Sequence, residues 1–414
     1  MRTLWMLTFQ ALRNRRTGFW LAVFSVAVSV VLLVGIDRLR KDVRAHFLQT
    51  VSRTDLIVAA PGGDIGILLG VIFHEGDDRT RIRWSDYEKV SRMPEVAWSV
   101  PVALGDSLHG FDVVGTDPGY FTHYRYAGGR SLSFAEGGNF KQFYDAVVGS
   151  EAAKRLHLRA GDTIVLSHGH GEHAHRHANR PFHVAGILAP SLTPADRTVF
   201  VRLDALEAIH VEWRSGRYVD MHLSAEDLEK LHVTPEHLSG MLLGLKNRAD
   251  VLAVERKIND SPDLKLRAVI PAKALAELWR LLSQVETVLF FIAGAVFFAA
   301  LLGIVSTLLA TLGERRREMA VLRALGAGPS QVFLLFALEA LITVAAGIVL
   351  GVVLLELLLF GVSQAGMAVP VSYGIDGGEA ALLALLLVAA LAAGSVPAFG
   401  AYRHSLKDGM TVRM

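Results

Sequence analysis

TVLFFIAGAVFFAALLGIVSTLLATLG, residues 287–313, is a run of 27 residues without a charged side chain. About 20 apolar helical residues are enough to cross the hydrocarbon core of a bilayer. Two other uncharged runs, 17–36 and 380–402, meet the same requirement. A fourth apolar stretch, 332–362, contains only two charged residues, Glu339 and Glu356. The chain of 414 residues is therefore predicted to be an α-helical membrane protein with four transmembrane helices.

The residues between the first two spans, 37–286, have the composition of a soluble domain. Acidic and basic side chains occur there in nearly equal numbers, and strand-like segments alternate with helix-like ones. This alternation predicts a large α+β domain inserted between transmembrane helices 1 and 2. The chain then divides into 1–36, 37–286 and 287–414. We expect strands at 55–60, 111–115, 163–166, 182–188, 198–201 and 264–269, and helices at 84–94 (with Ser85 as N-cap), 150–156, 203–209 and 249–258.

Positive charges flank the spans asymmetrically. Four arginines precede the first span, and basic residues are concentrated at 315–323 and 403–413. In the connection 363–379 the only charged residues are acidic. The positive-inside rule then places both termini in the cytoplasm and the inserted domain outside. An uncleaved signal-anchor helix fits the N-terminal run better than a cleaved signal peptide, because the run exceeds a typical h-region and ends without a small-residue cleavage motif.

Several classes of chemistry are excluded by the residues themselves. The chain has no cysteine, which rules out disulfides, thiolate nucleophiles and sulfur-ligated metal centres. It has no phosphate-binding Gly-x-x-x-x-Gly-Lys-[Ser/Thr] loop, no His-Glu-x-x-His and no Gly-x-Ser-x-Gly. We expect a non-catalytic protein whose energy comes from another chain or an ion gradient. A net charge of +2 indicates no acidic partner, and we expect no nucleic-acid binding.

The segment that follows the second span changes from charged to apolar residues. The set Met319, Val321, Leu322 and Leu325 suits a short amphipathic helix at the inner membrane face, ended by Gly326 and by Gly328-Pro329. The alternative is a solvated basic loop that only fixes topology.

Three segments carry a family resemblance. Glu314–Ala327 closely resembles the coupling segment of the FtsX/MacB/LolC permeases, and Glu339–Gly351 is similar to that family's third span. Val147–Ile164, with Val113–Phe121 before it, is similar to the MacB-like periplasmic core domain. The resemblance implies a permease subunit in the bacterial inner (plasma) membrane that works with a separate cytoplasmic ABC ATPase, which binds the ATP. It also implies a second permease protomer, contact with membrane lipid and a periplasmic partner. The ATPase-coupling residues would be Glu314, Arg315, Arg316, Arg317, Glu318, Met319, Leu322, Arg323, Leu325 and Gly326.

The apolar stretch 332–362 holds two carboxylates and a pair of glycines. Glu339 is expected near the inner interface and facing protein, because a charge facing lipid is costly. Glu356 falls about 25 Å further along the helix and is expected to be an exposed interfacial carboxylate. The spacing Gly347-x-x-x-Gly351 permits close helix approach, although such spacings also arise by chance.

The inserted domain contains a histidine-rich tract, 168–183, which the family resemblance does not require. Between two predicted strands, it is expected to form an exposed hairpin loop. Imidazoles alternating with small residues suit Zn²⁺ or a similar ion. The candidate ligands are His168, His170, His173, His175, His177 and His183. A solvated, pH-responsive loop without a metal is the alternative.

Three functions are compatible with these patterns. The first is a permease subunit that couples ATP hydrolysis to movement of its external domain, for export, extraction or mechanotransmission. The second is a regulatory membrane protein that controls a periplasmic enzyme or senses metal. The third, a metal-dependent external enzyme, has the least support because no hydrolase motif is present. Either two identical or two different permeases could form the pair.

Overall fold

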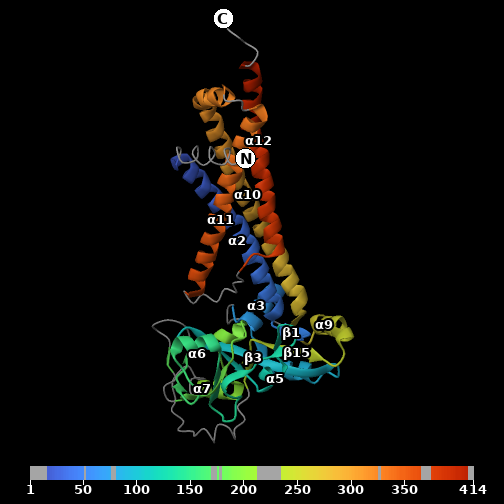
Figure 1. Cartoon of the computed structure of the whole chain (residues 1–414). Helices are drawn as coiled ribbons and strands as arrows, with labels where there is room; N and C mark the ends of the chain where they lie inside the picture. Colours follow the sequence, from blue (N-terminus) through green and yellow to red (C-terminus); the bar gives the residue numbers. More distant parts are fainter. Residues whose placement is uncertain are drawn as a thin grey trace. The chain divides into compact units, whose positions relative to one another are not determined.

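The computed structural model describes residues 16–50, 53–75, 81–168, 175–176, 180–211, 235–324, 328–364 and 374–408. Some of these, including 43–49 and 310–324, are described by their backbone only. The chain divides into two units, the first made of Met1–Val43 and Leu282–Met414 and the second of Arg44–Leu281 (Figure 1).

The first unit is a bundle of long apolar helices. Among the described residues, four helices are long and apolar enough to span a membrane, which confirms the four predicted spans. They are α2 (Arg16–Thr50), α10 (Pro271–Ala324), α11 (Pro329–Gln364) and α12 (Gly377–Asp408). Side chains of all four pack into one apolar core that includes Val30, Phe297, Phe336 and Leu386. The chain passes between the two units within α2 and again within α10.

The second unit is built on a mixed β-sheet, so the predicted α+β domain between the first two spans is confirmed. In its described part the strands run in the order β16-β1-β15-β3-β4-β13-β8-β12-β7, with β9, β10 and β11 paired beside this path. Most pairs are antiparallel, whereas β13 lies parallel to β4 and β12 parallel to β8. The strands are β1 (Leu56–Ala59), β2 (Ile82–Arg83), β3 (Val96–Leu108), β4 (Phe111–Thr116), β5 (Arg125–Tyr126), β6 (Arg130–Ser131), β7 (Phe134–Gly137), β8 (Asp145–Val148), β9 (Thr163–Ile164), β10 (Ser167–His168), β11 (His175–Arg176), β12 (Phe182–Leu188), β13 (Thr198–Arg202), β14 (His237–Leu238), β15 (Gly240–Leu245) and β16 (Arg267–Val269).

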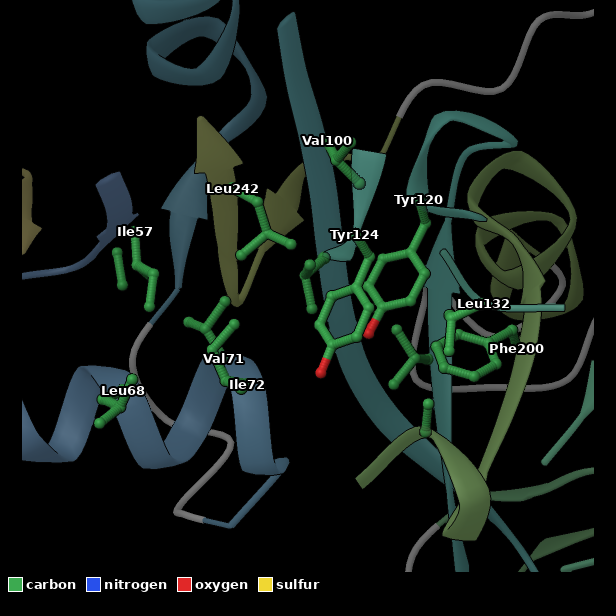
Figure 2. Close-up of a cluster of buried hydrophobic side chains, with 14 of the residues drawn as sticks. Ile57, Leu68, Val71, Ile72, Val100, Tyr120, Tyr124, Leu132, Phe200 and Leu242 are labelled. Atoms are coloured by element: carbon green, nitrogen blue, oxygen red, sulfur yellow. The ribbon is translucent and has the colours of Figure 1, made fainter. Parts of the chain in front are cut away.

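Short helices cover this sheet. They are α3 (Asp64–Phe73), α4 (Trp84–Ser91), α5 (Gly119–His123), α6 (Ser150–Leu156), α7 (Leu203–Val211) and α9 (Val251–Asn259), with 3₁₀ turns at Pro194–Arg197 and Arg248–Asp250. Figure 2 shows one core, in which Leu68 and Val71 of α3 lie near Ile57 and Leu242 of the sheet, with the α5 ring of Tyr120 on the other side of β3. Strand β3 is long enough to connect the two halves of the sheet, because it pairs with β15 along its first part and with β4 along its last part.

Most of the expected elements occur within one or two residues of their predicted bounds. Ser85 is not an N-cap, because α4 begins at Trp84 with Arg83 as its cap. The strand expected at 264–269 begins only at Arg267. Elements β3, β15 and α3 were not predicted. In β3, Pro101 and Gly105 are turn-forming residue types that mask the strand pattern, and a bulge between Leu104 and Asp106 accommodates the irregularity.

Candidate functional site

The predicted coupling segment is the last part of a long helix. Helix α10 continues through Ala324, so residues 314–324 extend the second span and do not form the separate short helix that we expected. Glutamate and arginine are good helix formers, and the helix meets no proline before Pro329 begins α11. Their side chains are not described, and Leu325 and Gly326 lie outside the described residues.

A buried arginine joins three helices of the bundle. Arg38, on α2, donates from Nε and Nη2 to the two carboxylate oxygens of Glu379 on α12, at 2.9 and 2.8 Å. Its Nη1 donates to Glu356 on α11 at 2.7 Å, and Nη2 also donates to the carbonyl oxygen of Gly374 at 2.8 Å. The side chains of Arg38, Glu379 and Glu356 are 3%, 2% and 30% exposed. We call these four groups the arginine cluster. The expectation that Glu356 is exposed is wrong, because its side chain is partly buried and accepts from this guanidinium.

A second, more exposed layer of charges lies beside the arginine cluster. Lys41, one turn beyond Arg38 on α2, contacts Asp37 at 2.5 Å and Asp376 at 2.8 Å. Asp376 precedes α12 and accepts the backbone N–H of Glu379 at 2.6 Å, as an N-cap does. The hydrogen bond from the Lys41 ammonium lowers the pKa of Asp376 below its ordinary value. Arg38 with Glu379, and Lys41 with Asp376, thus form two rungs of an antiparallel ladder between α2 and α12.

Glycines bring α2 close enough to α11 for these contacts. A Cβ atom on Gly347 would lie 2.6 Å from the Cβ of Val26, and one on Gly351 would lie 2.8 Å from the carbonyl oxygen of Ala27. Both distances are shorter than real Cβ contacts, so only glycine fits. The spacing noticed in the sequence is therefore a helix-packing surface. Glu339 is buried within the bundle, as expected for a carboxylate that faces protein.

The opposite face of α2 borders a groove. Arg40, together with residues 283–298 of α10, lines a cavity of about 750 Å³. Polar side chains such as Glu286 and Thr287 lie toward one end of this segment, and Phe290, Phe291 and Phe298 follow. A groove of this composition suits a molecule that has both a polar and an apolar part. Since Arg38 and Arg40 are two residues apart on a helix, they face different neighbours.

The C-terminal end of α2 is held within the second unit. The hydroxyl of Tyr124 donates to the backbone carbonyl oxygen of Thr50, the last residue of α2, at 2.7 Å. Tyr124 is fully buried, and burial raises the pKa of its phenol above the ordinary value. Its ring stacks on that of Tyr120, with ring centroids 5.1 Å apart (Figure 2). Helix α2 therefore makes specific polar contacts in each of the two units.

In its described part the histidine tract contains two short strands, β10 and β11, that pair antiparallel. His168 on β10 is paired in register with His175 on β11. His170, His173 and His177 lie outside the described residues. His183 lies on β12, exposed, with its Nδ1 3.5 Å from the hydroxyl of Thr163. Within the described ranges, no group of three His, Asp or Glu side chains is arranged to hold a metal ion.

A different histidine is buried in the second unit. His74 ends α3 in a left-handed conformation, with φ of 58°. The Thr198 hydroxyl donates to the carbonyl oxygen of Pro194 at 2.9 Å, so toward the Nδ1 of His74, 3.0 Å away, it acts as the acceptor. Nδ1 therefore carries the proton. Burial lowers the pKa of His74 to about 4.

This burial predicts a specific pH dependence. As pH falls from 7 to 4, the unfolded chain takes up a proton at this histidine before the folded chain does. The free energy of unfolding therefore falls by about 3 kcal/mol. His74→Asn keeps a donor and tolerates the left-handed backbone. Denaturant unfolding at both pH values should show this loss in the wild type and not in the variant. Equal pH dependence of the two proteins would contradict the burial of a neutral His74.

Sequence reasoning missed the arginine cluster, although a signal was present. Glu356 interrupts an apolar stretch, and Glu379 and Arg38 lie at the edges of two others. Charged groups within spans pair with one another. Matching these three would have suggested the cluster, but not its geometry.

Two family profiles match this chain. The sequence profile of the MacB-like periplasmic core domain matches residues 19–261, more than half of the chain, and that of the FtsX-like permease C-terminal region matches residues 290–407. The search of curated proteins found no match. The periplasmic region of MacB from Actinobacillus actinomycetemcomitans is similar, with 9% identity and a TM-score of 0.35, over 55% of this chain and 94% of that one. The extracellular domain of the noncanonic ABC-type transporter YknZ from Gram-positive bacteria has 13% identity and a TM-score of 0.31, over 52% and 98% of the two chains.

The first profile covers most of the inserted domain and the second covers the last three spans, in the order in which they occur in the chain. The chain therefore belongs to the FtsX/MacB family of ABC-transporter permeases and is a multi-pass membrane subunit of that class.

Proposed function

We propose that this permease couples ATP hydrolysis by a separate cytoplasmic ATPase to movement of its extracytoplasmic domain. The carrying observation is the continuity of α10, whose 54 residues begin at Pro271 and end at Ala324. Its contour length is about 80 Å, far more than the roughly 30 Å of a hydrocarbon core. One helix therefore contains both residues of the second unit and most of the candidate coupling segment.

Helix α2 provides a second mechanical connection. It is helical from Arg16 to Thr50, with Arg38 bound to α11 and α12 and Thr50 bound to Tyr124. About 18 Å of helix separates these two residues. A displacement of α2 within the bundle would therefore be carried along the helix to Thr50.

We further propose an assembly of two permease protomers with two ATPases, with both termini in the cytoplasm and the second unit outside. Four spans and no nucleotide-binding motif are too little for a complete transporter built from two multi-span halves. Large apolar side chains remain exposed on the first two spans, including Trp20, Phe24, Phe291 and Phe298. These would face a second protomer or membrane lipid, and the groove beside Arg40 would take up an amphipathic molecule.

The coupling proposal is tested by removing charge from the end of α10. Replacing Arg316, Glu318 and Arg323 together by alanine should leave membrane insertion intact, because the spans are unchanged, while ATP hydrolysis by the partner no longer drives work outside. Exposed single ion pairs contribute less than about 1 kcal/mol, so a triple change is needed. The measurement compares ATPase binding, ATP turnover and cargo movement in reconstituted complexes.

A matched control removes two basic and one acidic side chain elsewhere. Glu88 and Lys89 lie on α4 and Arg92 caps its C-terminal end, and Glu88 and Arg92 form an exposed ion pair. Their replacement by alanine should preserve coupling. Normal ATPase binding and full cargo movement in the α10 variant would rule out the coupling role of the segment. ATP turnover that responds to a periplasmic enzyme and moves no cargo would favour the regulatory alternative.

We also propose that the histidine tract binds Zn²⁺ or a similar ion. Occupancy of this site by the metal would modulate the activity of the permease. The hairpin register of His168 and His175 supports this proposal by bringing two histidine positions opposite each other on paired strands. Affinity for Zn²⁺ should collapse as pH falls through about 6.5, because protonated imidazole does not ligate metals.

Isothermal titration of the full chain with zinc chloride at two pH values measures this. Deleting residues 169–178 should remove most binding and leave the fold intact, whereas His237→Ala, an exposed histidine outside the tract, should have no effect. Micromolar or tighter binding that survives the deletion would exclude the tract as the site.

A further inference from the structure

Helix α2 contacts its neighbours in the bundle in two physically different ways. Along Val23–Val30 it packs on the small surface made by Gly347 and Gly351. Such apolar contacts are not directional, and within a membrane they lack a hydrophobic driving force. A short displacement of α2 along its axis would exchange one set of these contacts for another of the same kind.

The hydrogen bonds of the arginine cluster, in contrast, are directional. The fork of Arg38 binds Glu379 through two nitrogens and binds Glu356 through the third. Parallel N–H···O bonds of this kind fix both the distance and the plane of the guanidinium. A displacement of one helical turn, about 5.4 Å, would break all of these bonds together.

The ladder offers a second set of partners at that displacement. Arg38 and Lys41 are three residues apart on α2, and Asp376 and Glu379 are three apart at the start of α12. In the structure Arg38 pairs with Glu379 and Lys41 with Asp376. If α2 moved one turn toward its N-terminal end, Lys41 would come opposite Glu379. The buried carboxylate of Glu379 would keep a cation. Arg38 would lose its acceptors on Glu379, Glu356 and Gly374, so the displaced register has the higher free energy of the two.

We propose that α2 has two registers on α11 and α12, the one in the structure and one displaced by a turn in which Lys41 pairs with Glu379. The exchange between the two registers moves α2, and with it Thr50 and the Tyr124 side chain that is bound to Thr50. Discrete one-turn displacements of packed helices are a known form of switching. The inference rests on the proposed function, to which it gives a specific movement.

The absence of cysteine makes the two registers separately measurable. A Cβ atom on Gly35 would lie 3.2 Å from the Cδ1 of Leu355, so the pair Gly35→Cys with Leu355→Cys reports the register in the structure. Leu39, about one turn later, is 50% exposed here, and Leu39→Cys with Leu355→Cys reports the displaced register. The experiment uses the full chain in lipid nanodiscs, a short bifunctional thiol reagent and each single cysteine as control.

Arg38→Gln should lower cross-linking through position 35 by about tenfold and raise it through position 39, as expected when one partner of a buried ion cluster is lost. Lys41→Gln should instead reduce cross-linking through position 39 below the wild-type level, because the displaced register loses its cation. Loss of the first cross-link in Arg38→Gln without gain of the second would overturn the proposal, as would no change in either.

A second arm separates this inference from the proposed function. In the complex with its ATPase, adding ATP should shift the ratio of the two cross-links toward position 39. An unchanged ratio in a complex that hydrolyses ATP would overturn the register exchange and leave coupling standing. A complex without any ATP hydrolysis would contradict the proposed function, while the nucleotide-free cross-links would still decide whether both registers exist.

Discussion

Leucine in place of Gly347 is expected to force α2 away from α11 and to lower the free energy of unfolding of the bundle by about 1–3 kcal/mol, the range for overpacked interiors. The reason is the space available. Even a single added Cβ would lie 2.6 Å from the Cβ of Val26 and 3.0 Å from the carbonyl oxygen of Val23. A backbone oxygen cannot rotate away as a side chain can, so the helices must separate.

The same helix supplies the matched control. A Cβ on Gly361 of α11 would have no atom within 4 Å, so Gly361→Leu should be nearly neutral. Unfolding in mixed micelles with increasing sodium dodecyl sulfate measures both variants. If Gly347→Leu and Gly361→Leu are equally stable, α2 and α11 are not packed as described.

Removing the buried carboxylate of the arginine cluster is expected to have the largest effect of any single polar change in the bundle. Glu379→Ala leaves Arg38 buried without its two-point acceptor, and breaking a buried ion pair from one side costs about 3–5 kcal/mol. Glu356→Ala should cost less, because that carboxylate is 30% exposed. Glu379→Gln keeps a side-chain acceptor for the capping contact with Asp376 and isolates the contribution of the charge.

Lys41→Ala is the control for this series. Its ion pairs with Asp37 and Asp376 are more exposed, and exposed pairs contribute about 1 kcal/mol or less. Thermal unfolding in lipid nanodiscs should therefore rank Glu379→Ala below Glu356→Ala, and both below Lys41→Ala. A Glu379→Ala variant as stable as Lys41→Ala would show that the arginine cluster does not hold the three helices together.

The spans and the α+β domain could be predicted because each depends on patterns local in the sequence. Four uncharged or nearly uncharged runs specify four helices whatever their neighbours, and strands such as β12 and β13 show their apolar character directly. Strand β3 could not be found this way. Its proline and glycine contradict strand propensity, and only pairing with β15 and β4 stabilises it.

The arginine cluster escaped prediction for a different reason. Arg38 and Glu379 are 341 residues apart in the chain, and their contact depends on how three helices pack. Glu356 alone gave no indication of its partner, because a carboxylate at the membrane interface can be solvated by water and does not require a cationic partner. The candidate coupling segment was located by resemblance, but its continuity with α10 follows from the absence of any proline between the span and Ala324.

We propose that this chain is the membrane subunit of an ATP-driven complex. Native mass spectrometry of the full chain, extracted in lipid from cells that express it with its own ATPase, tests this most directly. We expect a complex of two permease protomers and two ATPase subunits. In the Arg316/Glu318/Arg323 triple-alanine variant, we expect either loss of the ATPases from this complex or loss of their coupling to the permease. A chain that remains monomeric and binds no ATPase in lipid would contradict it.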